Sequence, residues 1–291
     1  MKRRSVKILL AVVAIISFAL VIYLPQLMPS ETQDCSDIFY AEQSPVLQQD
    51  NFKQRSRQIC GNQQAILYSG VSKTPLWWAE KKPNFSQAPT QVAQVDGFAL
   101  AQWNSTSYLQ LPFASQQHLQ QWQQLDDVLG RMAKQYRQPI YVVSGSDYQE
   151  KNLIQLSNGV WAPQGFYKVV YMPDLGWSGG YYLSNTAGQP QLRYMSICAI
   201  EQQMKMQLFP SLALEQKREV YRWPRRIEEI QIEHLDYAYW DADSQCDVEK
   251  MLKNQQENTK STWIDTLVAQ LWELSHQGLL AVVAWLKAHN F

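Results

Sequence analysis

SQQHLQQWQQLDDVLGRMAKQY, residues 115–136, decides what kind of fold this chain can form. Apolar side chains recur along it at steps of three and four residues, which places them on one face of an α-helix. The members of this stripe are Leu119, Trp122, Leu125, Leu129, Met132 and Ala133. We therefore expect an amphipathic helix that packs one side against the rest of a folded domain.

Short runs of apolar, β-branched and aromatic residues lie on both sides of this helix, and they predict strands. We expect strands at residues 65–68 and 98–103 before the helix and at 140–143 after it, the last closed by Ser144-Gly145. Residues 81–94, with two prolines and many polar side chains, are expected to form a loop.

Further along the chain the pattern predicts a hairpin and a second helix. Residues 165–171 alternate, residues 176–180 supply a Gly-rich turn, and residues 181–183 return. A helix is expected over residues 197–209, ended by Pro210. This order of elements indicates an α+β fold, a twisted antiparallel sheet with helices packed on it.

The N-terminus has the pattern of a membrane anchor. Four basic residues and no acidic one occupy positions 1–7, and an uncharged run of 17 residues follows over 8–24. This length is the lower limit for a helix that crosses about 30 Å of hydrocarbon. Basic residues stay in the cytoplasm, so the chain after residue 29 is expected on the other side. We expect residues 1–29 to be a basic arm and one transmembrane helix, with a cleaved signal peptide as the alternative.

The four cysteines, Cys35, Cys60, Cys198 and Cys246, all follow this segment, where an oxidising compartment favours disulfides. Four cysteines allow three pairings. We favour Cys35–Cys60 with Cys198–Cys246, because this pairing closes the shortest loops. The expected location is therefore the inner membrane, single-pass, with the globular domain in the periplasm or outside the cell.

Charge argues against general nucleic-acid binding. The chain has 26 Lys and Arg and 26 Asp and Glu; without the four cations of the N-terminal arm, 22 cations face 26 anions, a net charge of −4. Such a domain has no long-range attraction for polyphosphate. The best local basic patch is the stretch formed by Lys217, Arg218, Arg222, Arg225 and Arg226, with aromatic residues between the charges. It is a candidate for nucleic-acid contact, although a solvated surface is the simpler interpretation.

The last residues differ from the rest. Residues 246–259 are polar and read as a linker, and residues 260–291 predict an amphipathic helix. This helix could lie on the membrane, bind an envelope protein partner, or cap the domain.

Several segments, taken in order, resemble the DNA/RNA non-specific endonucleases, which are ββα-metal (His-Me finger) enzymes. The stretch AILYSGVSKTPLWWAE, residues 65–80, is similar to their entry strand and turn, and PIYVVSG, residues 139–145, to the strand after the metal helix. Residues 98–104, 122–133, 167–171, 179–185 and 196–212 match further segments. The resemblance covers residues 60–212 and implies that residues 30–245 form an endonuclease-like domain.

The residues that carry the family's chemistry are different here. The family places Asp-Arg-Gly-His on a hairpin, where His is the general base, and an Asn on the next helix holds a divalent metal. The matching interval, residues 81–95, has no His and no Arg, and the catalytic hairpin is expected to be missing. The Asn position falls on His118, the acidic position on Asp126, and the Arg position on Gly130, beside Arg131.

No residue is therefore assigned a firm catalytic role. His118 is a candidate metal ligand, but a lone His is more often a surface or capping residue, and Asp126 and Asp127 are expected on a solvated helix face. Arg131 is a candidate phosphate contact. His234, near Asp236 and Asp241, is expected to be structural.

Two functions remain open from the sequence. The first is a membrane-anchored envelope protein whose endonuclease-like domain is inactive and acts as a binding or accessory module, with no cofactor. The alternative is an active endonuclease with a rearranged site near His118, which would need Mg²⁺ or Mn²⁺.

Overall fold

A computed structural model describes residues 35–48, 55–61, 63–82, 89–103, 108–149, 153–230, 235–238 and 245–247. The predicted N-terminal anchor, His234, and the predicted C-terminal helix lie outside the described residues. Among the helices that are described, none has the length and apolar character needed to cross a membrane.

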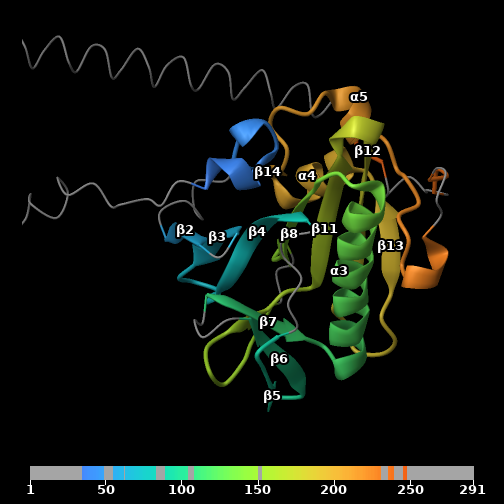
Figure 1. Ribbon diagram of the computed structural model, residues 1–291. Coiled ribbons are helices and arrows are strands. Elements are labelled where there is room, and N and C mark those ends of the chain that lie inside the picture. Colours follow the sequence, from blue (N-terminus) through green and yellow to red (C-terminus); the bar gives the residue numbers. More distant parts are fainter. Residues whose placement is uncertain are drawn as a thin grey trace, which may run out of the picture.

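A seven-stranded, fully antiparallel sheet forms the centre of the domain (Figure 1). Its strand order is β13-β12-β11-β8-β4-β3-β2. The strands are β2 (Ser56–Gly61), β3 (Gln64–Ser69), β4 (Thr74–Lys82), β8 (Ile140–Asp147), β11 (Gly165–Met172), β12 (Trp177–Ser184) and β13 (Leu192–Met195).

Smaller sheets complete the strand structure. A three-stranded antiparallel sheet, at the end of the molecule far from α5 in Figure 1, contains β5 (Gln91–Val95), β6 (Phe98–Trp103) and β7 (Leu109–Phe113). Two short pairs join β1 (Val46–Leu47) to β14 (Met206–Gln207), and β9 (Ile154–Gln155) to β10 (Trp161–Ala162).

Helix α3 (Gln116–Tyr136) lies along one face of the large sheet, as Figure 1 shows. Its predicted apolar stripe is buried, which confirms the amphipathic helix. The other described helices are short: α4 (Ile197–Met204), α5 (Leu214–Lys217), and the 3₁₀ turns η1 (Ser36–Ile38), η2 (Tyr40–Glu42), η3 (Pro173–Leu175) and η4 (Ile227–Glu229).

Strand alternation builds one apolar core on each face of the large sheet. Trp78 and Phe166 join the core under α3, whereas their neighbours Trp77 and Tyr167 join the second core on the opposite face. That second core also contains residues of η1 and α4. A mixed fold with a large antiparallel sheet and few helices is therefore confirmed.

Both predicted disulfides are present. Cys35 is bonded to Cys60, and Cys198 is bonded to Cys246. Cys246, at the start of the predicted linker, is followed by Asp247, whose backbone N–H donates to the side chain of Gln202 on α4. The segments that contain Cys35 and Cys246 are thus covalently linked to β2 and α4 of the domain.

Some predicted boundaries are wrong, for identifiable reasons. The helix expected over 197–209 ends at Met204, because Lys205 takes a left-handed conformation and the next residues form β14. The turn expected over 176–180 lies earlier, at η3, and Ser178, Gly179 and Gly180 are inside β12. The strand expected over 140–143 continues through Gly145 to Asp147.

The interval predicted as a loop contains two strand segments. β4 continues to Lys82, and β5 begins at Gln91 and pairs with β6. This β5–β6 hairpin contains neither His nor Arg. Strand β7, between β6 and α3, was not predicted. Tyr237 forms an isolated antiparallel bridge with Tyr221.

Candidate functional site

His118, at the position where the resembled family has its metal-binding Asn, is in the first turn of α3 and is only 1% exposed. Its Nδ1 lies 2.8 Å from the Oγ of Ser115, the residue that precedes the helix. Its Nε2 is buried and has no hydrogen-bond partner among the described residues. The imidazole is part of the packed interior, so a surface position is wrong, whereas the contact with Ser115, the N-cap residue of α3, is consistent with the alternative of a capping residue.

Burial also sets the protonation of this ring. Desolvation disfavours the charged form and lowers the pKa of His118 below its usual value. At neutral pH the ring is therefore neutral. Its described polar neighbour is a hydroxyl, not a carboxylate, so nothing there stabilises an imidazolium.

Asp126, two turns further along α3, belongs to a buried ion cluster that we call the Asp126 cluster: Glu80, Lys82, Asp126 and Lys168. Lys168 Nζ lies 2.7 Å from Asp126 Oδ1, and Lys82 Nζ lies 3.4 Å from the same oxygen. The side chains of both lysines are 0% exposed, and that of Asp126 is 21% exposed. The solvated helix face predicted for Asp126 is therefore wrong, whereas Asp127 is exposed.

The second carboxylate of the cluster comes from β4. Glu80 Oε2 accepts from Lys82 Nζ at 3.1 Å, so Lys82 lies between the two carboxylates. Lys168 Nζ is also 4.4 Å from the centre of the Trp122 ring, a cation–π contact. Three elements, β4, β11 and α3, are thus held together by two cations and two carboxylates.

The environment moves the pKa values of these carboxyl groups in opposite directions. Burial acts to raise the pKa of Asp126, but the ammonium groups of Lys168 and Lys82 outweigh it, and the pKa is lowered. For Glu80 the effect of burial is larger than that of the attraction to Lys82, so the pKa of Glu80 is raised. Burial acts to lower the pKa of Lys82, but the two carboxylates raise it. Lys82 therefore stays charged.

A divalent metal does not fit the side chains present at these positions. His118 has a hydroxyl beside it and no carboxylate ligand, and the carboxylates of Glu80 and Asp126 already bind ammonium groups. Across the described ranges, no three His, Cys, Asp or Glu side chains are grouped so that they could hold a metal ion. A reaction step through a metal cannot be derived from this arrangement.

The predicted basic stretch does not form one patch. Lys217 is buried, and its Nζ lies 3.0 Å from both carboxylate oxygens of Glu201. Arg225 donates to the carbonyl of Leu192 and lies 4.5 Å from the centre of the Tyr194 ring. The remaining members, Arg218, Arg222 and Arg226, are exposed.

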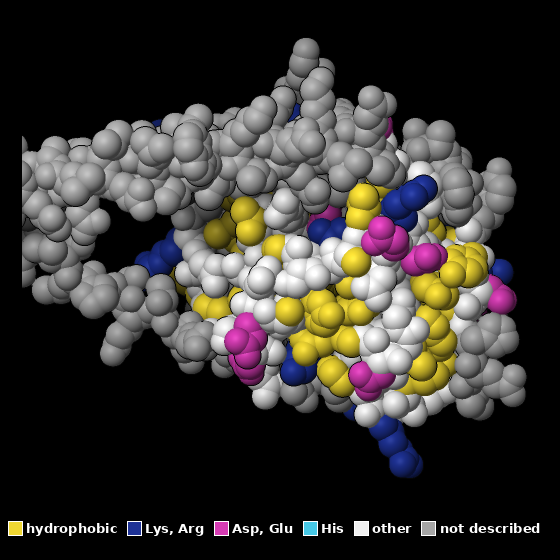
Figure 2. All heavy atoms as spheres, turned by 90° about the horizontal axis from the view of Figure 1, so that it is seen from above, with side chains coloured by type: hydrophobic (Ala, Val, Ile, Leu, Met, Phe, Trp, Pro, Cys, Tyr) yellow, Lys and Arg dark blue, Asp and Glu magenta, His cyan; other side chains and the backbone are white. Residues whose placement is uncertain are grey.

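Acidic groups further reduce the positive charge of this basic stretch. Arg226 lies 4.0 Å from Glu229 in an exposed pair, and the backbone of Arg225 donates to the same carboxylate. On the face shown in Figure 2, the visible Lys and Arg side chains are scattered, and several stand beside Asp or Glu. Arg131 is exposed on α3, and the structure gives it no ion pair among the described residues.

Sequence reasoning missed Glu80, Lys82 and Lys168. One signal was available: Lys168 sits in a strand of otherwise apolar and aromatic residues, in step with Phe166 and Val170, which point into the core under α3. A lysine on that face must find an anion.

Comparison with known proteins finds one family model that matches part of this chain. Residues 100–217 match the family model for DNA/RNA non-specific endonucleases. A chain in the crystal structure of the EndoG/EndoGI complex, which concerns the mechanism of EndoG inhibition, is 15% identical; the match covers 55% of this chain and 88% of that chain, with a TM-score of 0.43. No curated protein matches the sequence. Residues 100–217 are therefore similar to the DNA/RNA non-specific endonuclease family.

Proposed function

We propose that this chain is a membrane-anchored envelope protein whose endonuclease-family domain does not hydrolyse nucleic acid and acts as a binding or accessory module. The observation that carries the proposal is the environment of His118 and Asp126 on helix α3. His118 is packed inside the domain, and Asp126 is neutralised by two buried lysines.

Hydrolysis of a phosphodiester needs a base that can reach water. The neutral ring of His118 is buried beside Ser115, and its free nitrogen has no contact with solvent. Asp126 has a lowered pKa and two ammonium partners, so it is a poor proton acceptor. Loss of a general base alone costs roughly 10² to 10⁴ in rate.

The envelope location is supported by the sequence and the cysteines. The basic and apolar N-terminal segment predicts a single-pass anchor. All four cysteines form disulfides, which persist in oxidising compartments. Non-reducing mass mapping of the protein from cells should recover both bonds; free Cys35 and Cys246 would argue against this location.

A partner of the module is expected to be another envelope protein rather than a nucleic acid. The part of the chain after the N-terminal arm carries a net charge of −4, and two members of the predicted basic stretch have internal partners. The amphipathic pattern of residues 260–291 is suited to such a partner.

The direct test is a nuclease assay on the full chain in detergent. Plasmid DNA and RNA are incubated with the protein in Mg²⁺ or Mn²⁺, in parallel with His118→Ala. We expect no metal-dependent cleavage that distinguishes the two proteins. Cleavage that requires metal and disappears in His118→Ala would instead establish an active, rearranged nuclease.

A further inference from the structure

A cavity of about 420 Å³ opens beside the three-stranded sheet, and its described lining contains no member of the Asp126 cluster. It lies where the β5–β6 turn, the β9–β10 pair, the loop after β12 and Ala114, between β7 and α3, meet. Its size is in the range of small-molecule sites. The apolar residues in its lining include Phe98, Ala114, Leu153, Ile154, Ala162 and Pro163.

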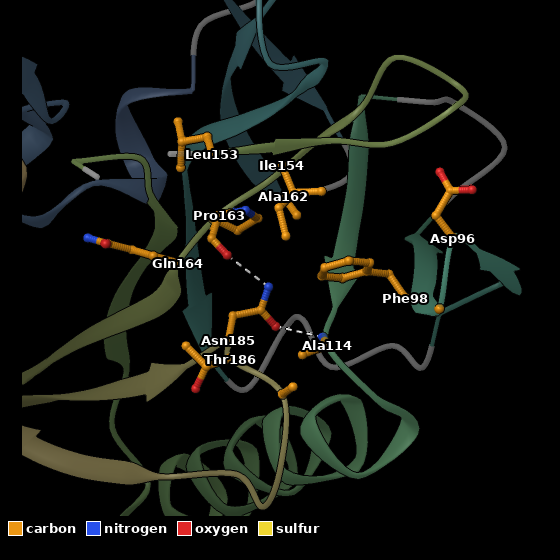
Figure 3. Close-up of a pocket in the computed structure, with 12 residues that line it drawn as sticks. Asp96, Phe98, Ala114, Leu153, Ile154, Ala162, Pro163, Gln164, Asn185 and Thr186 are labelled. Carbon is orange, nitrogen blue, oxygen red and sulfur yellow. Dashed lines mark hydrogen bonds between the residues drawn. The ribbon is translucent and has the colours of Figure 1, made fainter. Parts of the chain in front are cut away.

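The interior of this cavity is apolar. Figure 3 shows Ile154, Ala162 and Pro163 facing the ring of Phe98 across the opening, while the side chain of Gln164 extends away. Ile154 is 55% exposed, an uncommon position for an isoleucine. These groups can cover the body of an apolar or aromatic ligand.

Asn185 makes the cavity a preformed one. Its Nδ2 donates to the carbonyl of Pro112 at 2.9 Å. The same Nδ2 donates to the carbonyl of Pro163 at 2.9 Å, and the Oδ1 accepts from the backbone N–H of Ala114 at 2.7 Å (Figure 3). One buried amide therefore ties together three of the segments around the cavity. A preformed site of this kind avoids the entropic cost of ordering its segments when a ligand binds.

Asp96 is the single charged residue among the described residues that line the cavity. It lies in the two-residue β5–β6 turn, where Asp96 and Gly97 both have positive φ, at 49° and 86°. Its Oδ2 accepts from the backbone N–H of Ser157, which holds the carboxylate near the β9–β10 pair. A fixed negative charge beside an apolar cavity attracts cations and repels phosphates.

We propose that this cavity binds a small organic amine, whose apolar or aromatic body fills the space beside Phe98 and whose ammonium group faces Asp96. The same charge disfavours the phosphate groups of nucleotides. The proposal goes beyond the accessory role above and does not depend on it.

The test uses three probes with the same phenyl body and different charge: phenethylamine, phenethyl alcohol and phenylacetate. Dissociation constants are measured by titration calorimetry or ligand-observed NMR on the full chain in detergent. The amine should bind more tightly than the alcohol by roughly 2- to 5-fold, the range expected for an exposed ion pair, and phenylacetate should bind most weakly.

Two variants place the binding at this cavity. Asp96→Asn should remove the preference for the amine and leave the alcohol unchanged, because Asn tolerates the positive φ and can still accept from Ser157. Ala187→Trp, at an exposed lining position, should block all three probes. Ala213→Trp, at an exposed position outside the lining, is the matched control.

Any of three results would overturn the proposal. They are no measurable binding of phenethylamine, binding that Ala187→Trp and Ala213→Trp affect equally, and a preference for the amine that survives in Asp96→Asn. Thermal unfolding of each variant shows whether it is folded, and the three probes, compared on the unmodified chain, test the charge preference without any variant.

Discussion

Lys168 is a fully buried lysine in the interior of the domain. It stands alone among apolar and aromatic neighbours in β11, and its charge is matched by one oxygen of Asp126 at 2.7 Å. Two buried cations next to two carboxylates are stable only as a set, because removing one member leaves an uncompensated charge. This balance of buried charges explains why Asp126 contributes to the stability of the fold.

Replacement of this lysine by an apolar residue of similar length tests that view. Lys168→Met should lower the free energy of unfolding by about 3–5 kcal/mol, the usual cost of breaking a buried ion pair. Urea denaturation gives the measurement. The control is Lys134→Met on the exposed side of α3, which should change the value by no more than about 0.5 kcal/mol. Equal changes in the two variants would show that the Asp126 cluster does not contribute to the free energy of unfolding.

His118 should make the protein sensitive to mild acid. Its folded pKa is lowered by burial, so below the unfolded value near 6.5 the unfolded chain binds the proton more readily. Stability is full above about pH 6.5 and falls as pH decreases toward the folded pKa, by at most about 1.4 kcal/mol per pH unit.

The variant His118→Gln keeps a hydrogen-bonding group near Ser115 but does not titrate. Between about pH 7.5 and pH 5 its free energy of unfolding should decrease less than that of the original protein, by up to about 2 kcal/mol. Urea denaturation at both pH values measures the difference. An identical loss in the two proteins would show that His118 is not the acid-sensitive group.

At the scale of elements, β8 shows why the local sequence predicted the wrong end for a strand. Ser144-Gly145 has the composition of a turn, yet Gly145 pairs with Trp77 on β4 and Tyr167 on β11. A Cβ at this position would overlap Tyr167 Oη and the carbonyl oxygen of Leu76. Gly145 is therefore required by close packing between strands.

Gly145→Ala should consequently destabilise the large sheet. The added methyl group meets a backbone carbonyl that cannot move independently, and overpacking of this kind costs about 1–3 kcal/mol or more. Gly70→Ala is the control, since its Cβ would meet only Arg55 O at 3.4 Å. The shift in thermal midpoint should be large for Gly145→Ala and small for Gly70→Ala; equal shifts would contradict the packing argument.

At the scale of the whole molecule, both disulfides lie on the same side of the large sheet. Cys35 and Cys246 pack against the core opposite α3. The predicted anchor precedes Cys35, and the predicted amphipathic segment follows Cys246. The described domain between these two cysteines has its own two cores and a complete sheet.

Deletion of residues 260–291 should therefore leave a cooperatively folded protein. If this segment binds a partner or a membrane surface, the urea midpoint and the slope m should not change, because m follows the surface exposed on unfolding. Loss of cooperative unfolding would identify the segment as a structural cap. The same deletion should reduce association with an envelope partner in a pull-down experiment.

Several features could be predicted from the sequence because they depend on local order. The apolar stripe at 119–133 is a property of one helix, and the disulfide pairing followed from the shortest loops. The absence of the Asp-Arg-Gly-His pattern can be read directly from residues 81–95. The resemblance to the endonuclease family rested on segments in a fixed order, which the family match over 100–217 supports.

Only the tertiary structure decided what the polar residues do. Glu80, Lys82, Asp126 and Lys168 come from three elements, and no spacing along the chain reveals that they meet. The same is true of the cavity, which forms where turns from separate strands are brought together by Asn185. Periodicity reports which face of an element is buried; it carries no information on which charges that burial will place side by side.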